Sequence, residues 1–257
     1  MKASKKMFLI DLVTLMPEMF KAFTNLGVVG RGFKKNFVDI NFINPRNFTT
    51  DTHKTIDDRA YGGGPGMVMM AKPLIESIES ARIREKSLGI KKRKVIHLTP
   101  KGPKLKHEKV KELSCEEGLI LIASRYEGVD ERLNKWIDEE LSIGDFVTSG
   151  GELPAMLLMD ALIRQIPGVL NDIESVNQDS FVNGLLDHPS FTRPESVRGL
   201  NVPDILLSGD HEKIRIWRLK ESLKATKLKR PDLLINKSLT KEESRLLNEI
   251  EQEQEQD

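Results

Sequence analysis

The sequence predicts an α/β domain with a mostly parallel sheet, followed by a small helical domain. Apolar segments of strand length alternate with helical patterns, which is typical of a parallel sheet covered by helices. A polar stretch without periodicity then runs from Leu170 to Ser180 and marks the clearest boundary. The 257 residues suffice for one large domain and a small one. We therefore expect a first domain at 1–169, a flexible linker at 170–180 and a helical domain at 181–257.

The elements of the first domain follow from local patterns. Leu9 to Leu15 is apolar except for Asp11 and Thr14, which predicts the first strand. Pro17 suits the first turn of a short helix, and Gly27 suits its end. Apolar spacing predicts the other elements, which are strands at 38–42, 94–98 and 119–123 and helices at 73–86, 105–113, 129–137 and 152–165.

The composition is that of a globular protein, with 39% hydrophobic and 31% charged residues. No run approaches the roughly 18 to 20 apolar residues of a membrane span. The first residues also lack the apolar stretch of a signal peptide, so we expect a cytoplasmic protein without a membrane partner. Cys115 is the only cysteine, which excludes an intrachain disulfide.

A glycine-rich stretch from Ser142 to Gly151 is the first candidate for ligand binding. Its glycines and hydroxyls surround one apolar pair, Phe146 and Val147, so the backbone is suited to close approach. Its amides and carbonyls could bind a flat polar ligand such as adenine. A simple turn between a strand and a helix is the alternative interpretation.

A second glycine-rich run, Gly62 to Gly66, ends a long polar connection. It lacks the Lys-Ser/Thr ending and the preceding strand of a phosphate-binding P-loop, which argues against nucleotide hydrolysis. A flexible loop is the simpler interpretation. Its flanking residues are nonetheless able to hydrogen-bond a nucleotide, namely His53, Asp57, Asp58 and Arg59.

Three segments follow predicted strands at their carboxyl ends, where ligands of such sheets bind: 98–100, 124–128 and 142–151. Arg125, Tyr126 and Glu127 belong to the second of these, although a turn and a helix cap explain them equally well. Asp130 is better explained as a helix cap near the positive end of the next helix. The five histidines are dispersed and no Cys/His pair has zinc-ligand spacing, so no structural zinc site is expected.

Two further residues have open interpretations. Arg164 lies on a predicted helix and is by default a surface arginine. Asp179 lies at the end of the linker, where it fits a helix cap. A carboxylate on a mobile connection could equally swing onto a substrate.

The second domain carries an uneven charge. Between Gly209 and Arg230 there are eight Lys or Arg residues against three acids, with Trp217 among them. Such a segment is a candidate surface for a phosphate backbone, although a solvated helix face has the same pattern. Thr240 and Glu243 predict a capping box at the start of the last helix. The acidic end, Glu249 to Asp257, is expected to be disordered.

Several ordered and correctly spaced motifs together resemble one family over nearly the whole chain. They lie at 16–20, 57–67, 125–132, 142–145, 149–155, 166–170 and 184–187. The family is that of the bacterial tRNA (guanine-N1)-methyltransferases, the TrmD family of the SPOUT superfamily. The resemblance implies methylation of guanosine at position 37 of tRNA, beside the anticodon, with S-adenosylmethionine as the methyl donor. It also implies a homodimer with active sites at the subunit interface and a deep trefoil knot, a rare exception among folds.

Site residues carry over from the family by motif. The cofactor-binding residues are Leu98, Pro100, Ser124, Tyr126, Glu127, Gly128, Ile143, Gly144, Asp145, Phe146, Val147, Thr148, Gly150 and Gly151. The tRNA-binding residues are expected to be His53, Asp57, Arg59, Arg193, Arg215 and Arg218. Magnesium dependence is implied as well, with Glu127 as a participant, but one carboxylate does not make a recognisable metal site.

The resemblance assigns Asp179 as the general base and Arg164 as its catalytic partner. Guanine N1 carries a proton and becomes a good nucleophile only when that proton leaves, which a positioned carboxylate can accept. Negative charge then builds toward O6, where an arginine can stabilise it. The methyl transfer itself mainly requires positioning.

Four positions depart from the family pattern. Ser124 stands where glycine is common, Thr148 where leucine is common, and His97 and Phe146 where tyrosine is frequent. We expect these changes to affect cofactor affinity rather than the reaction type. Two alternatives stay open: an RNA-binding protein that has lost catalysis, and a SPOUT enzyme that acts on rRNA or another nucleoside.

Overall fold

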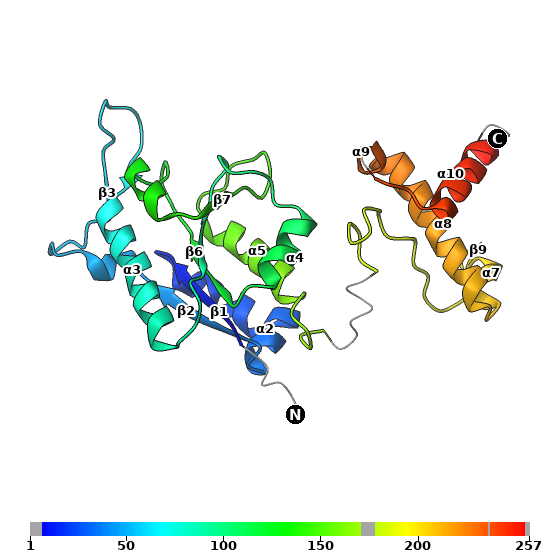
Figure 1. Ribbon diagram of the computed structural model, residues 1–257, viewed down its shortest axis with the longest axis horizontal. Coiled ribbons are helices and arrows are strands. Elements are labelled where there is room, and N and C mark those ends of the chain that lie inside the picture. The colour runs from blue at the N-terminus through cyan, green and yellow to red at the C-terminus, as the bar shows by residue number, and fades with distance from the viewer. Residues whose placement is uncertain (1–6, 171–177, 236, 255–257) are drawn as a thin grey trace. The chain divides into compact units, whose positions relative to one another are not determined.

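The computed structural model describes residues 7–170, 178–235 and 237–254 (Figure 1). The chain divides into two units, Met1–Ile173 and Glu174–Asp257, and each is described by itself. The division falls within the segment that the sequence predicts to be a linker. Residues 171–177 of that linker lie outside the described residues, as do the first six residues of the chain.

A five-stranded parallel sheet forms the centre of the first unit. Its strands are β1 (Phe8–Val13), β2 (Val38–Ile43), β5 (Lys94–Leu98), β6 (Gly118–Ile122) and β7 (Glu139–Leu141). They stand in the order β2-β1-β6-β5-β7, and each neighbouring pair is parallel. The prediction of an α/β fold with a parallel sheet is therefore confirmed.

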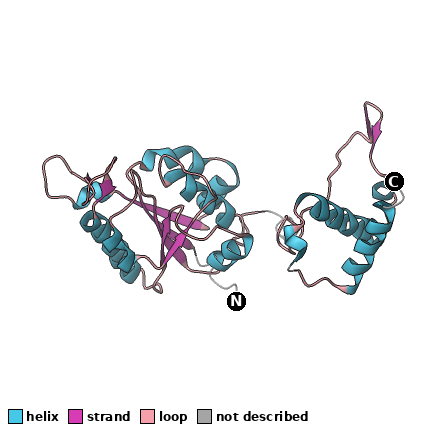
Figure 2. Cartoon of the chain, turned by 90° about the horizontal axis from the view of Figure 1, so that it is seen from above, coloured by secondary structure: helices cyan, strands magenta, loops and turns pink. Residues whose placement is uncertain are grey.

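Helices cover both faces of this sheet (Figure 2). The helices are α2 (Gly27–Lys34), α4 (His107–Ser114) and α5 (Glu152–Ile163) on one face, and α3 (Ala71–Ser87) with the 3-10 helix η3 (Glu131–Trp136) on the other. The strands supply each core with alternate residues. In β6, Leu119 and Leu121 join the core of the first face, while Ile120 and Ile122 join that of the second.

The helix predicted from Pro17 ends near Gly27 as expected, as η1 (Pro17–Phe20) and α1 (Lys21–Asn25). A further helix, α2, then follows, which the sequence analysis missed because its eight residues contain three glycines. Two of these glycines allow close packing. A Cβ at Gly30 would collide with the backbone of Asn25, and one at Gly32 would lie 3.1 Å from a methyl group of Ile163.

Several short elements were also missed. The long polar connection contains η2 (Pro45–Phe48) and β3 (Asp57–Asp58), which pairs with β4 (Val68–Met69) as an antiparallel hairpin around the glycine-rich run. Strand β7 was missed because it is short and acidic. The helix expected at 129–137 is η3, and the prediction that Asp130 caps it is confirmed, since its Oδ1 accepts a hydrogen bond from the N–H of Arg132 (2.9 Å).

The second unit is built mainly from helices. Its elements are β8 (Ser196–Val197), β9 (Leu200–Asn201), α7 (Asp204–Leu207), α8 (His211–Lys229), α9 (Asp232–Ile235) and α10 (Lys241–Gln254). Its buried core consists of Leu185, Leu223, Leu246 and Ile250. The predicted capping box is confirmed: the N–H of Thr240 donates to Glu243 Oε2 (2.7 Å) and the N–H of Glu243 donates to Thr240 Oγ1 (3.1 Å).

The expectation of a disordered acidic end is wrong as far as Gln254, because α10 continues through it. Ile250 is buried in the core, which fixes this stretch on α8. Acidic residues also pair with lysines of α8, as in Lys220–Glu253 (2.6 Å) and Lys227–Glu251 (2.9 Å). Residues 255–257 lie outside the described residues. None of the described helices has the length and apolar character needed to cross a bilayer.

Candidate functional site

A pocket of about 310 Å³ lies where β5, β6 and β7 end in the first unit. This volume is at the lower end of the range of about 300 to 1,000 Å³ for small-molecule sites. Three loops line it, one after each strand. The lining residues are Leu98, Thr99, Pro100, Lys101, Ser124, Tyr126, Glu127, Gly128, Leu141, Ser142, Ile143, Gly144, Phe146, Val147, Thr148, Gly150, Gly151 and Pro154.

Close backbone contacts hold the loop after β7 against the end of β6. The N–H of Gly151 donates to the carbonyl of Ser124 (2.7 Å). A Cβ at Gly151 would lie 2.6 Å from the Cα of Ala123, so any larger residue would push the two segments apart. A Cβ at Gly150 would lie 2.8 Å from Glu152 Oε2. These glycines are required by close approach, as the sequence analysis inferred for this stretch.

The loop after β5 is bound in turn to the end of β7. The N–H of Leu105 donates to the carbonyl of Ser142 (2.7 Å), and the N–H of Ser142 donates to that of Pro103 (2.9 Å). Gly102 packs so closely on this strand that a Cβ would lie 2.5 Å from the carbonyl carbon of Glu140. Hydrogen bonds and close packing therefore join the loops that form the pocket walls to one another.

A buried ion pair anchors the loop after β6. Arg125 Nε lies 3.1 Å from Oε2 of Glu152, which is buried in the first turn of α5. A carboxylate there is also favoured by the positive end of the helix. The hydroxyl of Thr14, on the chain after β1, donates to Glu152 Oε1 (2.9 Å). Arg125 thus positions the backbone from which its neighbours enter the pocket.

Tyr126 adopts a left-handed backbone conformation (φ +60°), which residues other than glycine seldom adopt. Its hydroxyl interacts with the carboxylate of Asp57 on β3. Partial burial, together with this carboxylate, raises the pKa of Tyr126 above its usual value. The contact connects the cofactor-type pocket to the hairpin that carries the second glycine-rich run.

The predicted cofactor-binding residues can now be placed. All of them line this one pocket except Asp145, whose carboxylate pairs with Lys104 and is mostly exposed. Two further lining residues, Thr99 and Ser142, belong to the segments proposed for ligand binding but were not assigned to the cofactor. Lys101, Leu141 and Pro154 also line the pocket and lie outside those segments. Lys101 and Leu141 directly adjoin the segments, so position after a strand was the available signal.

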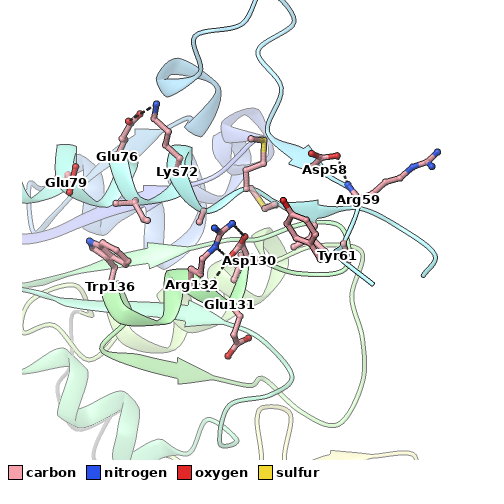
Figure 3. A pocket seen from close by; sticks show the side chains of 17 residues that line it. Asp58, Arg59, Tyr61, Lys72, Glu76, Glu79, Asp130, Glu131, Arg132 and Trp136 are labelled. Atoms are coloured by element: carbon pink, nitrogen blue, oxygen red, sulfur yellow. Dashed lines mark hydrogen bonds and ion pairs between the residues drawn. The ribbon is translucent and has the colours of Figure 1, made fainter. Parts of the chain in front are cut away.

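A second hollow of the first unit, of about 1,100 Å³, lies between the β3–β4 hairpin, α3 and η3 (Figure 3). Arg59 and Tyr61 line it from the hairpin side, and Trp136 from η3. Of the other predicted tRNA-binding residues in this unit, Asp57 contacts Tyr126 and His53 lies in an exposed turn. The hollow mixes acids and bases, so it is not a basic surface for phosphates.

In the second unit, Asp179 lines a pocket of about 840 Å³ together with Arg215 and Arg218. The structure thus brings the predicted base and two predicted tRNA-binding arginines to one hollow. The alternative that Asp179 caps a helix is wrong, because residues 178–185 form turns. Arg215 is also held by two acids, Glu212 (2.8 Å) and Glu242 (2.7 Å).

Arg193 lines a neighbouring pocket of about 590 Å³, which also includes Arg218. Two aromatic rings, Phe191 and Trp217, lie there with centroids 6.3 Å apart. The combination of arginines and aromatic rings suits an unstacked nucleobase. Arg164, by contrast, lies at the C-terminus of α5 in the first unit, so its partnership with Asp179 stays a prediction.

Comparison with known proteins decides the family. A family profile described as "tRNA (Guanine-1)-methyltransferase TrmD" matches residues 8–236. The chain belongs to the TrmD family. It is 58% identical over 245 residues to the "tRNA (guanine-N(1)-)-methyltransferase" of Methylobacillus flagellatus, which covers 95% of this chain and 93% of the relative. The resemblance found from sequence motifs is therefore confirmed.

Further relatives of the TrmD family have the same name. The protein of Chromobacterium violaceum is 53% identical over 95% of this chain and 96% of its own length. That of Pseudoalteromonas atlantica is 54% identical over 94% of this chain and 90% of its own length. The similarity is thus not confined to the sheet domain.

The family resemblance implies two small ligands, S-adenosylmethionine and magnesium. The residues present suit the first better than the second. The pocket at the strand ends offers glycine backbone, apolar side chains and hydroxyls, which suits the adenosine part of S-adenosylmethionine. Magnesium has no comparable set: in the described ranges no three His, Cys, Asp or Glu side chains gather as metal ligands.

Proposed function

We propose that the protein transfers a methyl group from S-adenosylmethionine to N1 of guanosine at position 37 of tRNA, in the cytoplasm. The observation that carries this proposal is the glycine-walled pocket at the ends of β5, β6 and β7, in a chain of the TrmD family. A pocket of this kind follows the rule that open α/β sheets bind ligands beyond the carboxyl ends of their strands.

The pocket residues hold the cofactor in this proposal. Leu98, Ile143 and Val147 contribute apolar surface, and the backbone around Gly150 contributes amides and carbonyls for the adenine. When bound, S-adenosylmethionine supplies an electrophilic methyl group on its sulfonium. The glycine contacts keep the walls close, so positioning rather than covalent chemistry is the protein's contribution.

The residues that act on the base are Asp179 and Arg164. Asp179 accepts the N1 proton of guanine, and Arg164 stabilises the negative charge that builds toward O6. Asp179 is half-buried in a hollow that two arginines also line, a setting that suits a positioned carboxylate. The catalytic partnership therefore combines a residue of each unit.

The knot and the homodimer belong to the same proposal. The loop after β5 is hydrogen-bonded to Ser142, and the chain after β7 returns to Ser124 at the end of β6, a path that supports a trefoil knot. Exposed leucines on α5, Leu153 and Leu157, support a second subunit on that helix. A site at the subunit interface would let Arg164 and Asp179 come from different copies.

The tRNA contacts divide between the units. Asp57 and Arg59 lie on the hairpin next to Tyr126, where the target base must approach the cofactor, and His53 lies in the exposed turn before it. Arg193, Arg215 and Arg218 line the hollows on α8, which suits the backbone and bases of the anticodon branch. The segment 170–180 is the proposed linker between them.

The test is transfer of labelled methyl from S-adenosylmethionine to unmodified tRNA, followed by mapping of the modified nucleoside. Asp179→Ala should lower the single-turnover rate at least about 100-fold, the lower range for loss of a general base. Asp232→Ala is the matched control, because it removes an exposed acid of the same unit that pairs with Arg230. Methyl on another nucleoside, or an equal rate for Asp179→Ala, would overturn the proposal.

A further inference from the structure

His97 is a buried histidine at the end of β5, directly beneath the cofactor-type pocket. Its Nε2 lies 2.9 Å from Oγ of Ser124, at the end of the neighbouring strand β6. Its Nδ1 is buried and has no hydrogen-bond partner among the described residues. Glu140 of β7 is nearest on that side, with Oε1 at 3.6 Å. A carboxylate, an imidazole and a hydroxyl thus lie in a row across three adjacent strands.

Two charged groups face the imidazole ring. Glu140 approaches from β7, and Lys101 acts on it from the loop after β5. From β6 the ring meets the hydroxyl of Ser124, which does not titrate. The Glu140 carboxylate lies on the Nδ1 side of the ring and is a hydrogen-bond acceptor, so it favours the tautomer that has its proton on Nδ1.

This tautomer determines what Ser124 can do. With the proton on Nδ1, Nε2 has a free lone pair and accepts the hydroxyl proton of Ser124. The remaining lone pairs of the Ser124 oxygen are then available to the pocket, which this residue lines. The hydroxyl is therefore an acceptor toward the ligand. Ser124 and His97 are also two of the departures from the family pattern, and the structure places them in direct contact.

We propose that the Glu140–His97–Ser124 chain sets the hydrogen-bonding polarity of the cofactor pocket, so that Ser124 accepts a hydrogen bond from a hydroxyl or amino group of the bound cofactor. This inference rests on the proposed function of the pocket. Ser124 contacts the cofactor, whereas His97 and Glu140 are positioning residues that act through Ser124.

Protonation of His97 reverses the arrangement. Both ring nitrogens then donate, so Nε2–H occupies the Ser124 oxygen and the serine hydroxyl turns its proton toward the pocket. A donor would then face a donor of the cofactor. Burial lowers the pKa of His97 below its usual value of 6.5, against the opposing effect of Glu140. Cofactor affinity is therefore full above about pH 6.5 and falls as the pH drops through the lower pKa of His97.

The test is calorimetric titration of the full-length protein with S-adenosylmethionine, without tRNA, from pH 5 to pH 8. The wild-type dissociation constant should rise as the pH falls through the pKa of His97, by up to about five-fold, the equivalent of roughly one hydrogen bond. Ser124→Ala should bind about five-fold more weakly at pH 8 and lose this pH dependence. Ser87→Ala is the matched control: its exposed hydroxyl lies at the end of α3 and does not line the pocket, so both values should stay as in the wild type.

Nitrogen NMR of the histidine rings gives a second readout that a merely structural role would not move. It should show His97 as the Nδ1–H tautomer at pH 7.5, and Glu140→Gln should shift the balance toward Nε2–H. An Nε2–H tautomer in the wild type, or equal pH profiles for wild type and Ser124→Ala, would overturn the inference and leave the proposed function intact. Absence of binding at every pH would overturn both.

Discussion

Asp11 lies within β1 with its side chain fully buried, and its charge is balanced from two other elements. Arg93, itself buried just before β5, contacts Asp11 Oδ2 (2.5 Å), and Arg84 of α3 contacts Asp11 Oδ1 (3.1 Å). Arg93 also pairs with Glu85 (3.3 Å). Such a network contributes little net stability when complete, but loss of one partner leaves a buried charge uncompensated.

Arg93→Ala should therefore lower the free energy of unfolding by about 3 to 5 kcal/mol, because Asp11 would lose its main buried partner. Urea unfolding followed by circular dichroism measures this change. Lys72→Ala is the control: its pair with Glu76 is 4.0 Å long and the lysine is mostly exposed, so the loss should stay within about 0.5 kcal/mol. A loss of less than 1 kcal/mol for Arg93→Ala would contradict the buried network.

Single residues show where prediction from sequence stops. Asp11 and Thr14 were recognisable as polar exceptions in an apolar strand. Their partners were not, because Arg93 lies 82 residues away from Asp11 and Glu152 lies 138 residues away from Thr14. The same holds for His97 and Ser124: periodicity placed His97 on one strand and Ser124 directly after another, without indicating that these two strands are neighbours. Pairing across a sheet depends on strand order, which no local pattern contains.

At the scale of elements, fewer of the basic side chains of helix α8 are available to a ligand than its sequence suggests. The acidic helix α10 packs along it, and Lys220 and Lys227 are paired with Glu253 and Glu251. The hydrogen bond to Glu253 raises the pKa of Lys220 above its usual value. Part of the positive charge that we assigned to tRNA binding is thus neutralised within the unit.

Replacing Glu251 and Glu253 together by glutamine should release both lysines. Binding of labelled tRNA should tighten about two- to five-fold at low salt, and the dependence of log K on log salt should steepen by up to about 0.7 to 0.9 per added phosphate contact. Anisotropy titrations at several KCl concentrations measure both. The control replaces Glu18 of η1 and Glu108 of α4 by glutamine, which changes the net charge equally and should leave the slope unchanged. An unchanged slope in the α10 variant would show that these lysines do not reach tRNA.

The elements that sequence predicted well are those whose packing follows their own periodicity. Strand β5 has the predicted bounds, and α10 begins at its capping box. The elements that were missed depend on their neighbours. Helix α2 forms despite its glycines because Gly30 and Gly32 fit closely against other helices, and β7 forms because Lys94 and Lys109 pair with Glu139.

At the scale of the whole molecule, the two units have separate cores. Residues of the sheet unit make up two buried clusters, and Leu223 belongs to a third that lies within the second unit. Each core is closed by its own helices. Local stability is therefore expected to change independently in the two units.

Leu223→Ala tests this independence. It removes a fully buried side chain, so the local free energy of opening in α8 and α10 should fall by about 2 to 5 kcal/mol. Hydrogen exchange measured by mass spectrometry should speed up in these helices and stay unchanged in β1, β5 and β6. Faster exchange in the sheet would mean that the stability of the two units is coupled.

The pocket has a consequence for how the protein is made. Its walls come from residues 98–101, 124–128 and 141–154. The last wall is hydrogen-bonded to the first between Leu141 and Thr99, and to the second between Gly151 and Ser124. During translation, the segments that form these walls leave the ribosome in that order. A nascent chain that has emerged only to residue 128 already contains most of the sheet, yet it has no enclosed site. The growing chain thus gains its binding site in one step, when the third glycine-rich segment arrives.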